Sequence, residues 1–118
     1  MEVRHELRLM GINSTEVSYG FGQLGSGYLD DTGALTPPTG KVIVAIQVIA
    51  EAKFTTLTAD TAQGNDAAFI GTAAQVAGNG ANSEAIAAAD AFGKGITIYG
   101  RWTACTLASG TVVVYYGE

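Results

Sequence analysis

The chain has 118 residues, 47% of them hydrophobic and 14% charged, and its six basic and eleven acidic residues leave a formal net charge of −5. So much apolar sequence with so few charges excludes intrinsic disorder and suffices for one β domain, residues 1–118, with a modest core. The basic residues are scattered and form no stripe, so nucleic acid is not an expected partner. The longest apolar run, Val42–Ala50, is far too short to span a bilayer, and the charged N-terminus lacks the apolar core of a secretory signal. A soluble protein made in a cytoplasm, with no membrane partner, is therefore expected.

Residues 2–9, within the possible arm at residues 1–10, alternate cleanly: Val3, His5, Leu7 and Leu9 lie on one side and charged residues on the other. A period of two predicts a strand with one solvated face, or an arm that pairs with a neighbouring chain. The four residues of the first side are interface candidates.

Residues 11–40 are rich in Gly, Ser, Thr and Asp, which favours loops. Val17–Phe21 is a candidate short strand within them. Thr36–Gly40 is predicted to be a stiff loop, because each of its two prolines lacks an N–H donor and restricts the preceding residue. Long loops in a small domain often serve as contact surfaces.

Lys41–Ala50 is apolar on both faces, which predicts a central strand buried on both sides. Glu51–Ala59 is predicted as a second strand after a bend, or as the far end of one long strand. Ala67–Gly95 is dominated by small residues. Its second half could hold a short helix that begins near Ser83 and stops at Gly93, but irregular or strand structure is the favoured interpretation.

Gly95–Gly117 is rich in β-branched and aromatic residues and is expected to anchor the fold. Ser109-Gly110 separates two such runs and suits a two-residue hairpin loop, so Trp102–Ala108 and Thr111–Tyr116 are predicted to pair with each other. Gly100 is expected at a bulge or bend. The chain as a whole is predicted to be all-β: a small antiparallel β-sandwich or barrel with a C-terminal hairpin and little helix.

Asp31-Thr32-Gly33 is the most conspicuous candidate for chemistry. Retroviral-type aspartic proteases use this triplet at a dimer interface, where two carboxylates share a proton. Here Asp30 precedes it in place of an apolar residue, and Gly25-Ser26-Gly27 lies upstream in place of an apolar strand. The favoured interpretation is a β-turn, with a dimeric protease that uses Asp31 as a remote alternative.

His5 and Cys105 are each the only residue of their type. A lone His on an apolar strand face is expected to be a half-buried structural residue, and Cys105 is expected to act as a small hydrophobe. No catalytic residue, cofactor site or metal site is predicted, and the protein is expected not to be an enzyme.

Four aromatic residues near the C-terminus have two interpretations. They could fill the core, or they could serve as contact residues, since aromatic types are enriched at interface hot spots. Adjacent residues of a strand point to opposite faces, so at least one of Tyr115 and Tyr116 should be exposed. The candidates are Tyr99, Trp102, Tyr115 and Tyr116.

The segment from Gly93 to Tyr116, with Gly-Lys-Gly-Ile-Thr-Ile-Tyr-Gly-Arg-Trp-Thr followed by the Ser-Gly pair, resembles the ends of short, acidic, Gly/Ala/Thr-rich virion proteins of tailed bacteriophages. The resemblance implies a capsid decoration (cement) protein in the virion, with the major capsid protein and further copies of itself as partners. A tail, collar or fibre component, with glycan binding as one option, is the alternative. The arm at residues 1–10 would act by adding a strand to a neighbour's sheet.

Overall fold

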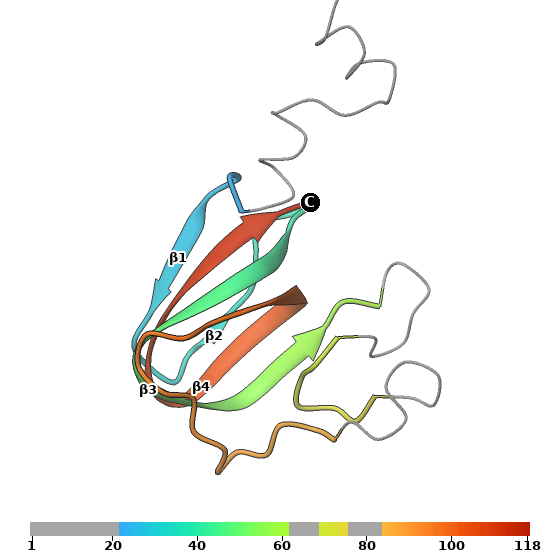
Figure 1. The fold of residues 1–118 in the computed structure, drawn as a ribbon. Helices are drawn as coiled ribbons and strands as arrows, with labels where there is room; N and C mark the ends of the chain where they lie inside the picture. Colours follow the sequence, from blue (N-terminus) through green and yellow to red (C-terminus); the bar gives the residue numbers. More distant parts are fainter. Residues whose placement is uncertain (1–21, 62–68, 76–83) are drawn as a thin grey trace, which may run out of the picture.

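The computed structural model describes residues 22–61, 69–75 and 84–118. Within these ranges the chain is all-β, and its four strands form one antiparallel sheet (Figure 1). The strands are β1 (Ser26–Leu29), β2 (Ala34–Leu35), β3 (Val42–Ala59) and β4 (Thr97–Gly117). In the described part of the chain, no helix is long and apolar enough to cross a membrane.

Strand β4 organises the sheet, because each of the other three strands pairs with it. β1 pairs with its C-terminal part, with Leu29 opposite Val112, and β2 pairs with its middle, with Leu35 opposite Cys105. β3 pairs along nearly the whole length of β4, from Val42 opposite Gly117 to Ala59 opposite Trp102. The segment that sequence analysis expected to anchor the domain is therefore the strand on which the sheet is built.

The two long strands bend together, and the bend brings the start and the end of β4 to opposite sides of the first half of β3 (Figure 1). Near the middle, the pairing passes from Ala50 opposite Thr111 to Lys53 opposite Ser109 with a shift in register. The start of β4 also returns to β3, so that Ile46 pairs with both Ile98 and Val114. The first half of β3 consequently lies between two segments of the same strand. Closure of this bent sheet into a sandwich or a barrel remains a prediction.

The predicted Ser109-Gly110 hairpin is wrong. β4 continues through this pair as one strand, and the runs on either side pair with β3 and not with each other. Gly110 does have the expected positive φ, +96°, but it uses that conformation at the bend against β3. A positive-φ glycine suits a bulge as well as a turn, so the local signal could not separate the two. The 18-residue partner β3 decides the outcome, because it pairs with both runs.

Of the two alternatives for Glu51–Ala59, the far end of one long strand is the one observed, since β3 runs from Val42 to Ala59 without interruption. Its first part is buried as predicted, from Val42 to Ile46 and again at Val48. Residues 11–40 were read too uniformly as loop, because they contain β1 and β2. These strands are four and two residues long, too short for a periodicity to stand out. Val17–Phe21 lies outside the described residues.

The core gathers residues from all of the long elements. Trp102, Phe54 and Ile43 are among its largest fully buried side chains. The remaining members are Leu29, Ile46, Val48, Ala52, Leu57, Cys105, Leu107, Val112, Val114 and Tyr116.

Residues 69–75 and 84–93 form two irregular segments that bond to β3, and neither contains a helix. For residues 84–93 this confirms the favoured interpretation of irregular or strand structure. Thr72 donates its backbone N–H to the Leu57 carbonyl (2.9 Å). Phe92 forms an isolated antiparallel bridge with Ala52, and its ring packs edge-on against Phe54 with centroids 5.2 Å apart. These contacts give the second half of β3 partners beyond β4.

Candidate functional site

One face of the sheet carries tyrosines that the core does not use. Alternation along β4 sends Val112, Val114 and Tyr116 inward, so Val113 and Tyr115 lie on the opposite face. The pairing register then arranges this outer face in two rows. One row runs across the strands through Ser26, Tyr115, Ala45 and Tyr99, and the other through Tyr28, Val113, Gln47 and Thr97. We call this surface the tyrosine face, after Tyr28, Tyr99 and Tyr115.

The outermost tyrosines are strongly exposed, at 66% for Tyr28 and 74% for Tyr99. Tyr115 lies between them, half-buried, and its hydroxyl donates to the Gln47 side-chain oxygen at 3.2 Å. This bond crosses from β4 to β3 and orients both side chains. Exposed aromatic side chains held in place by a sheet are the usual components of a binding surface.

A shallow hollow lies between Tyr115 and Tyr99, with a volume of about 280 Å³. Ala45 lies between the two tyrosines in the row, and because its side chain is short, it forms the floor of the hollow. Gln47 and Thr97 from the neighbouring row complete the hollow together with Gly22 and Gln23. All seven lining residues are uncharged.

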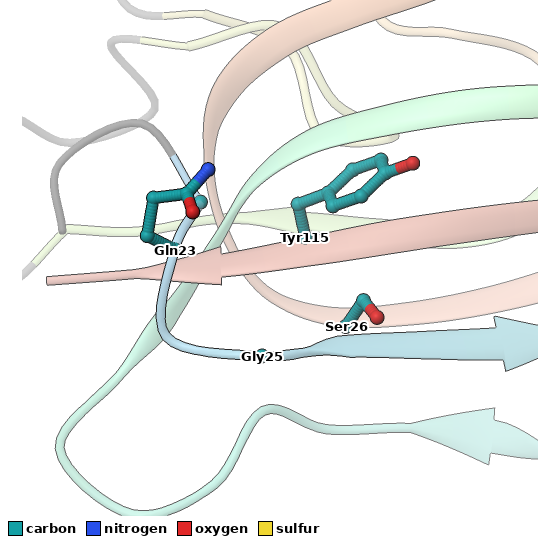
Figure 2. A pocket seen from close by; sticks show the side chains of 5 residues that line it. Gln23, Gly25, Ser26 and Tyr115 are labelled. Atoms are coloured by element: carbon teal, nitrogen blue, oxygen red, sulfur yellow. The ribbon is translucent and has the colours of Figure 1, made fainter. Parts of the chain in front are cut away.

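A second hollow lies on the other side of Tyr115, lined by Gly22, Gln23, Gly25 and Ser26 (Figure 2). The loop that carries Gln23 is tied to β4, because the Leu24 N–H donates to the Tyr116 carbonyl and the Tyr116 N–H donates to the Gly25 carbonyl. Space on both sides makes the Tyr115 ring a divider between the two hollows.

Gly22 allows this loop to approach the sheet. Its φ is +93°, and a Cβ at this position would lie 2.9 Å from the Tyr115 Cβ. A larger residue would push the loop, and Gln23 with it, off the tyrosine face.

The structure divides the predicted interface residues. Tyr99 and Tyr115 lie together on the tyrosine face, whereas Trp102 and Tyr116 are in the core, at 0% and 8% exposure. The expectation that Tyr115 and Tyr116 point to opposite faces is confirmed. Val3, His5, Leu7 and Leu9 lie outside the described residues.

Tyr28 was missed because it stands in a stretch that reads as loop. The signal was alternation within β1, where Leu29 turns inward and Tyr28 outward. Only pairing with β4 makes that alternation meaningful, since it places Tyr28 opposite Val113.

Asp31 lies in an exposed turn, which confirms the favoured interpretation of Asp30–Gly33. Its Oδ1 accepts the Gly33 N–H at 2.8 Å. A carboxylate bonded to the backbone two residues on is the ordinary way in which Asp stabilises a turn. The side chain therefore serves its own loop in this structure.

Another carboxylate, Asp60, is buried and was not singled out from the sequence. Its Oδ2 lies 3.2 Å from Arg101 Nε, and its backbone N–H donates to the Arg101 carbonyl at 2.8 Å. Arg101 also donates to the Glu118 carbonyl. The group joins the end of β3 to β4, so we assign it a structural role. Among the described residues, no cluster of three or more His, Cys, Asp or Glu side chains could hold a metal ion.

Cys105 is fully buried, and desolvation raises the pKa of its thiol to about 12. Since only the thiolate is a good nucleophile, the folded protein should not react with Ellman's reagent at pH 8. The same protein in concentrated urea should release one equivalent of chromophore. Rapid reaction without urea would show that β2 and β4 open around this residue.

Comparison of the chain with family models, with curated proteins and with solved structures found no match. The described residues therefore form an all-β domain with an uncharged, tyrosine-bearing surface on one side of its sheet.

Proposed function

We propose that this protein is a non-enzymatic structural component of a tailed-bacteriophage virion, and specifically a capsid decoration protein that stabilises the head lattice. Its partners are the major capsid protein and further copies of the chain. Many small contacts, repeated over a symmetric lattice, together resist the pressure inside the head.

The observation that carries the proposal is β4, the strand with which all the others pair and which contains most of the segment that resembles phage virion proteins. Three residues with reactive or ionisable side chains in the described part of the chain serve the fold: Asp31 stabilises its own turn, Cys105 fills the core, and Asp60 pairs with Arg101. What the domain offers to its surroundings is the tyrosine face, a surface of aromatic and uncharged polar side chains. Part of that surface comes from β4.

Mass spectrometry of purified virus particles tests the proposal directly. The copy number of this chain should equal that of the major shell protein or a simple fraction of it. A handful of copies per particle would place the protein in the tail or collar, and absence from particles would contradict any virion role.

The predicted arm provides a second test on the same particles. Deletion of residues 1–10 is expected to lower occupancy on particles severalfold, because the arm would add a strand to a neighbour's sheet through backbone hydrogen bonds. The control is Ile70→Ser, which removes a 40%-exposed apolar side chain outside the tyrosine face. Unchanged occupancy after the deletion would remove the arm from the mechanism.

A tail, collar or fibre component is the second candidate. The observation that favours it is the pair of hollows beside Tyr115, which combine aromatic rings with amides and hydroxyls. Such lining suits a sugar, and attachment parts of virions contact cell surfaces. Copy number separates this candidate from the first.

The dimeric aspartic protease remains a remote alternative. It requires two Asp31 carboxylates side by side, and it predicts acid-shifted proteolysis that Asp31→Asn abolishes. An Asp31→Asn protein with full proteolytic activity would exclude this alternative.

A further inference from the structure

We infer that the hollow between Tyr115 and Tyr99 binds one pyranose ring of a neutral glycan. The inference deepens the proposed function and rests on it, because a sugar site is useful to a virion protein whose tyrosine face points away from the particle. Attachment to the lattice would then fall to other parts of the chain, the predicted arm among them.

The spacing of the aromatic rings is the first argument. Tyr115 and Tyr99 stand in one row with Ala45 between them. Neighbouring strands lie about 4.8 Å apart, so the two backbones are separated by about 10 Å across the floor of the hollow. A six-membered ring can therefore lie over Ala45 with a tyrosine on each side. The C–H groups on one side of a pyranose carry slight positive charge and stack on the negative face of an aromatic ring.

The polar groups supply the second argument. A sugar presents hydroxyls that both donate and accept, and an amide side chain offers both functions. The Tyr115 hydroxyl donates a hydrogen bond to the Gln47 side-chain oxygen, and the Gln47 NH₂ group is then a donor beside the hollow. The Thr97 hydroxyl and the Gln23 amide line the same space. Few, well-placed polar groups beside aromatic rings are typical of small-molecule sites.

Charge decides which class of glycan fits. None of the residues that line the two hollows is charged, and the chain carries a net charge of −5. An acidic sugar would find no cation in the hollow and would meet repulsion from the molecule as a whole. A neutral hexose or N-acetylhexosamine meets neither obstacle.

The same features argue against a protein partner on this surface. Protein contacts have an apolar, well-packed centre surrounded by a polar rim. Here the order is reversed, because the centre is hollowed and holds Gln47, whereas the exposed rings of Tyr28 and Tyr99 stand at the outer strands.

Saturation-transfer NMR and calorimetric titration of the full-length protein test the inference. The probes are maltotriose and N,N′,N″-triacetylchitotriose, with the single acidic sugar N-acetylneuraminic acid as the charged comparison. Saturation should pass from the protein to at least one neutral probe and not to the acidic sugar. No transfer to either neutral probe, or tighter binding of the acidic sugar, would overturn the inference.

Variants of Tyr99 locate the site. Tyr99→Ala should weaken binding at least tenfold, whereas Tyr99→Phe, which keeps the ring, should stay within about twofold of the parent. Since Tyr99 is 74% exposed, neither change threatens the core. Ile70→Ser should bind like the parent. Equal affinity of Tyr99→Ala and the parent would sink the assignment.

Particles distinguish the inference from the proposed function. Binding of a neutral probe by virions, lost when they carry the Tyr99→Ala chain, would support the inference and a place for the chain in the virion, and the copy number would still decide between the head and the tail. Protection of Tyr99 from surface labelling in assembled virions would overturn the inference alone, because the face would then be a lattice contact. Absence of the chain from virions would contradict the proposed function without altering the titration of the free protein.

Discussion

Replacement of Gly110 by alanine is expected to lower the free energy of unfolding by about 3 kcal/mol or more, because two costs act at one residue. The φ of +96° is unfavourable for any residue with a Cβ. The added Cβ would also meet the Glu51 carbonyl oxygen and the Ala52 Cα of β3. Both neighbours are backbone atoms, so no side-chain rotation can relieve the contact.

Gly40→Ala is the matched control for this prediction. Gly40 has a similar φ of +82°, but nothing lies within 4 Å of a Cβ built there. It should therefore lose only the conformational part, about 1 to 2 kcal/mol. Urea denaturation of both variants, with unchanged slopes, measures the difference. Equal losses would mean that β3 and β4 do not approach each other at the bend.

Trp102→Phe is expected to cost about 2 to 3 kcal/mol and to loosen one particular segment. The indole is fully buried, and its Nε1–H donates to the Ile70 carbonyl at 2.6 Å. Phenylalanine leaves a gap and removes the donor. The backbone hydrogen bond from Thr72 to Leu57 lies two residues after Ile70. In Trp102→Phe, the Thr72 amide should therefore exchange its hydrogen faster relative to the global unfolding rate.

Phe54→Leu provides the contrasting variant. Phe54 is also fully buried, but its ring contacts Phe92 and it holds no bond to Ile70. It should lower global stability by a comparable amount while loosening the Phe92 amide, which donates to the Ala52 carbonyl. If both variants accelerate exchange at Thr72 and Phe92 alike, the two irregular segments are not held separately, and the assignment of one aromatic anchor to each is wrong.

The two anchors show why the irregular segments were difficult to derive from composition. Residues 69–75 and 84–93 contain few large side chains, and the alternating alanines of the second segment indicate a strand that the structure does not form there. Their positions are set by partners far away in sequence: Ile70 by Trp102, 32 residues later, and Phe92 by Ala52, 40 residues earlier. Nothing within either segment identifies such a partner.

Part of the tyrosine face could be predicted from the sequence. Aromatic type marked Tyr99, Trp102, Tyr115 and Tyr116 as candidates, and alternation required Tyr115 and Tyr116 to point to opposite faces. It could not say which of the two faces the core, and the expectation that one of them would be exposed is wrong, since Tyr115 is half-buried and Tyr116 is buried. The neighbours on each side settle the matter: Tyr116 packs in the core, whereas Tyr115 reaches Gln47.

By itself, the sequence determined what depends on side-chain type and short-range geometry. It determined the all-β class, strand structure at Lys41–Ala50 and Glu51–Ala59, the turn at Asp31 and the positive φ of Gly110. These follow from β-branched runs and turn residues, whose preferences act over a few positions. The tertiary structure alone decided that Gly110 bends a continuous strand, that Trp102 belongs to the core, and that Tyr28, Tyr115 and Tyr99 share one face. Those outcomes depend on strand register, which is set by pairing between residues far apart in the chain.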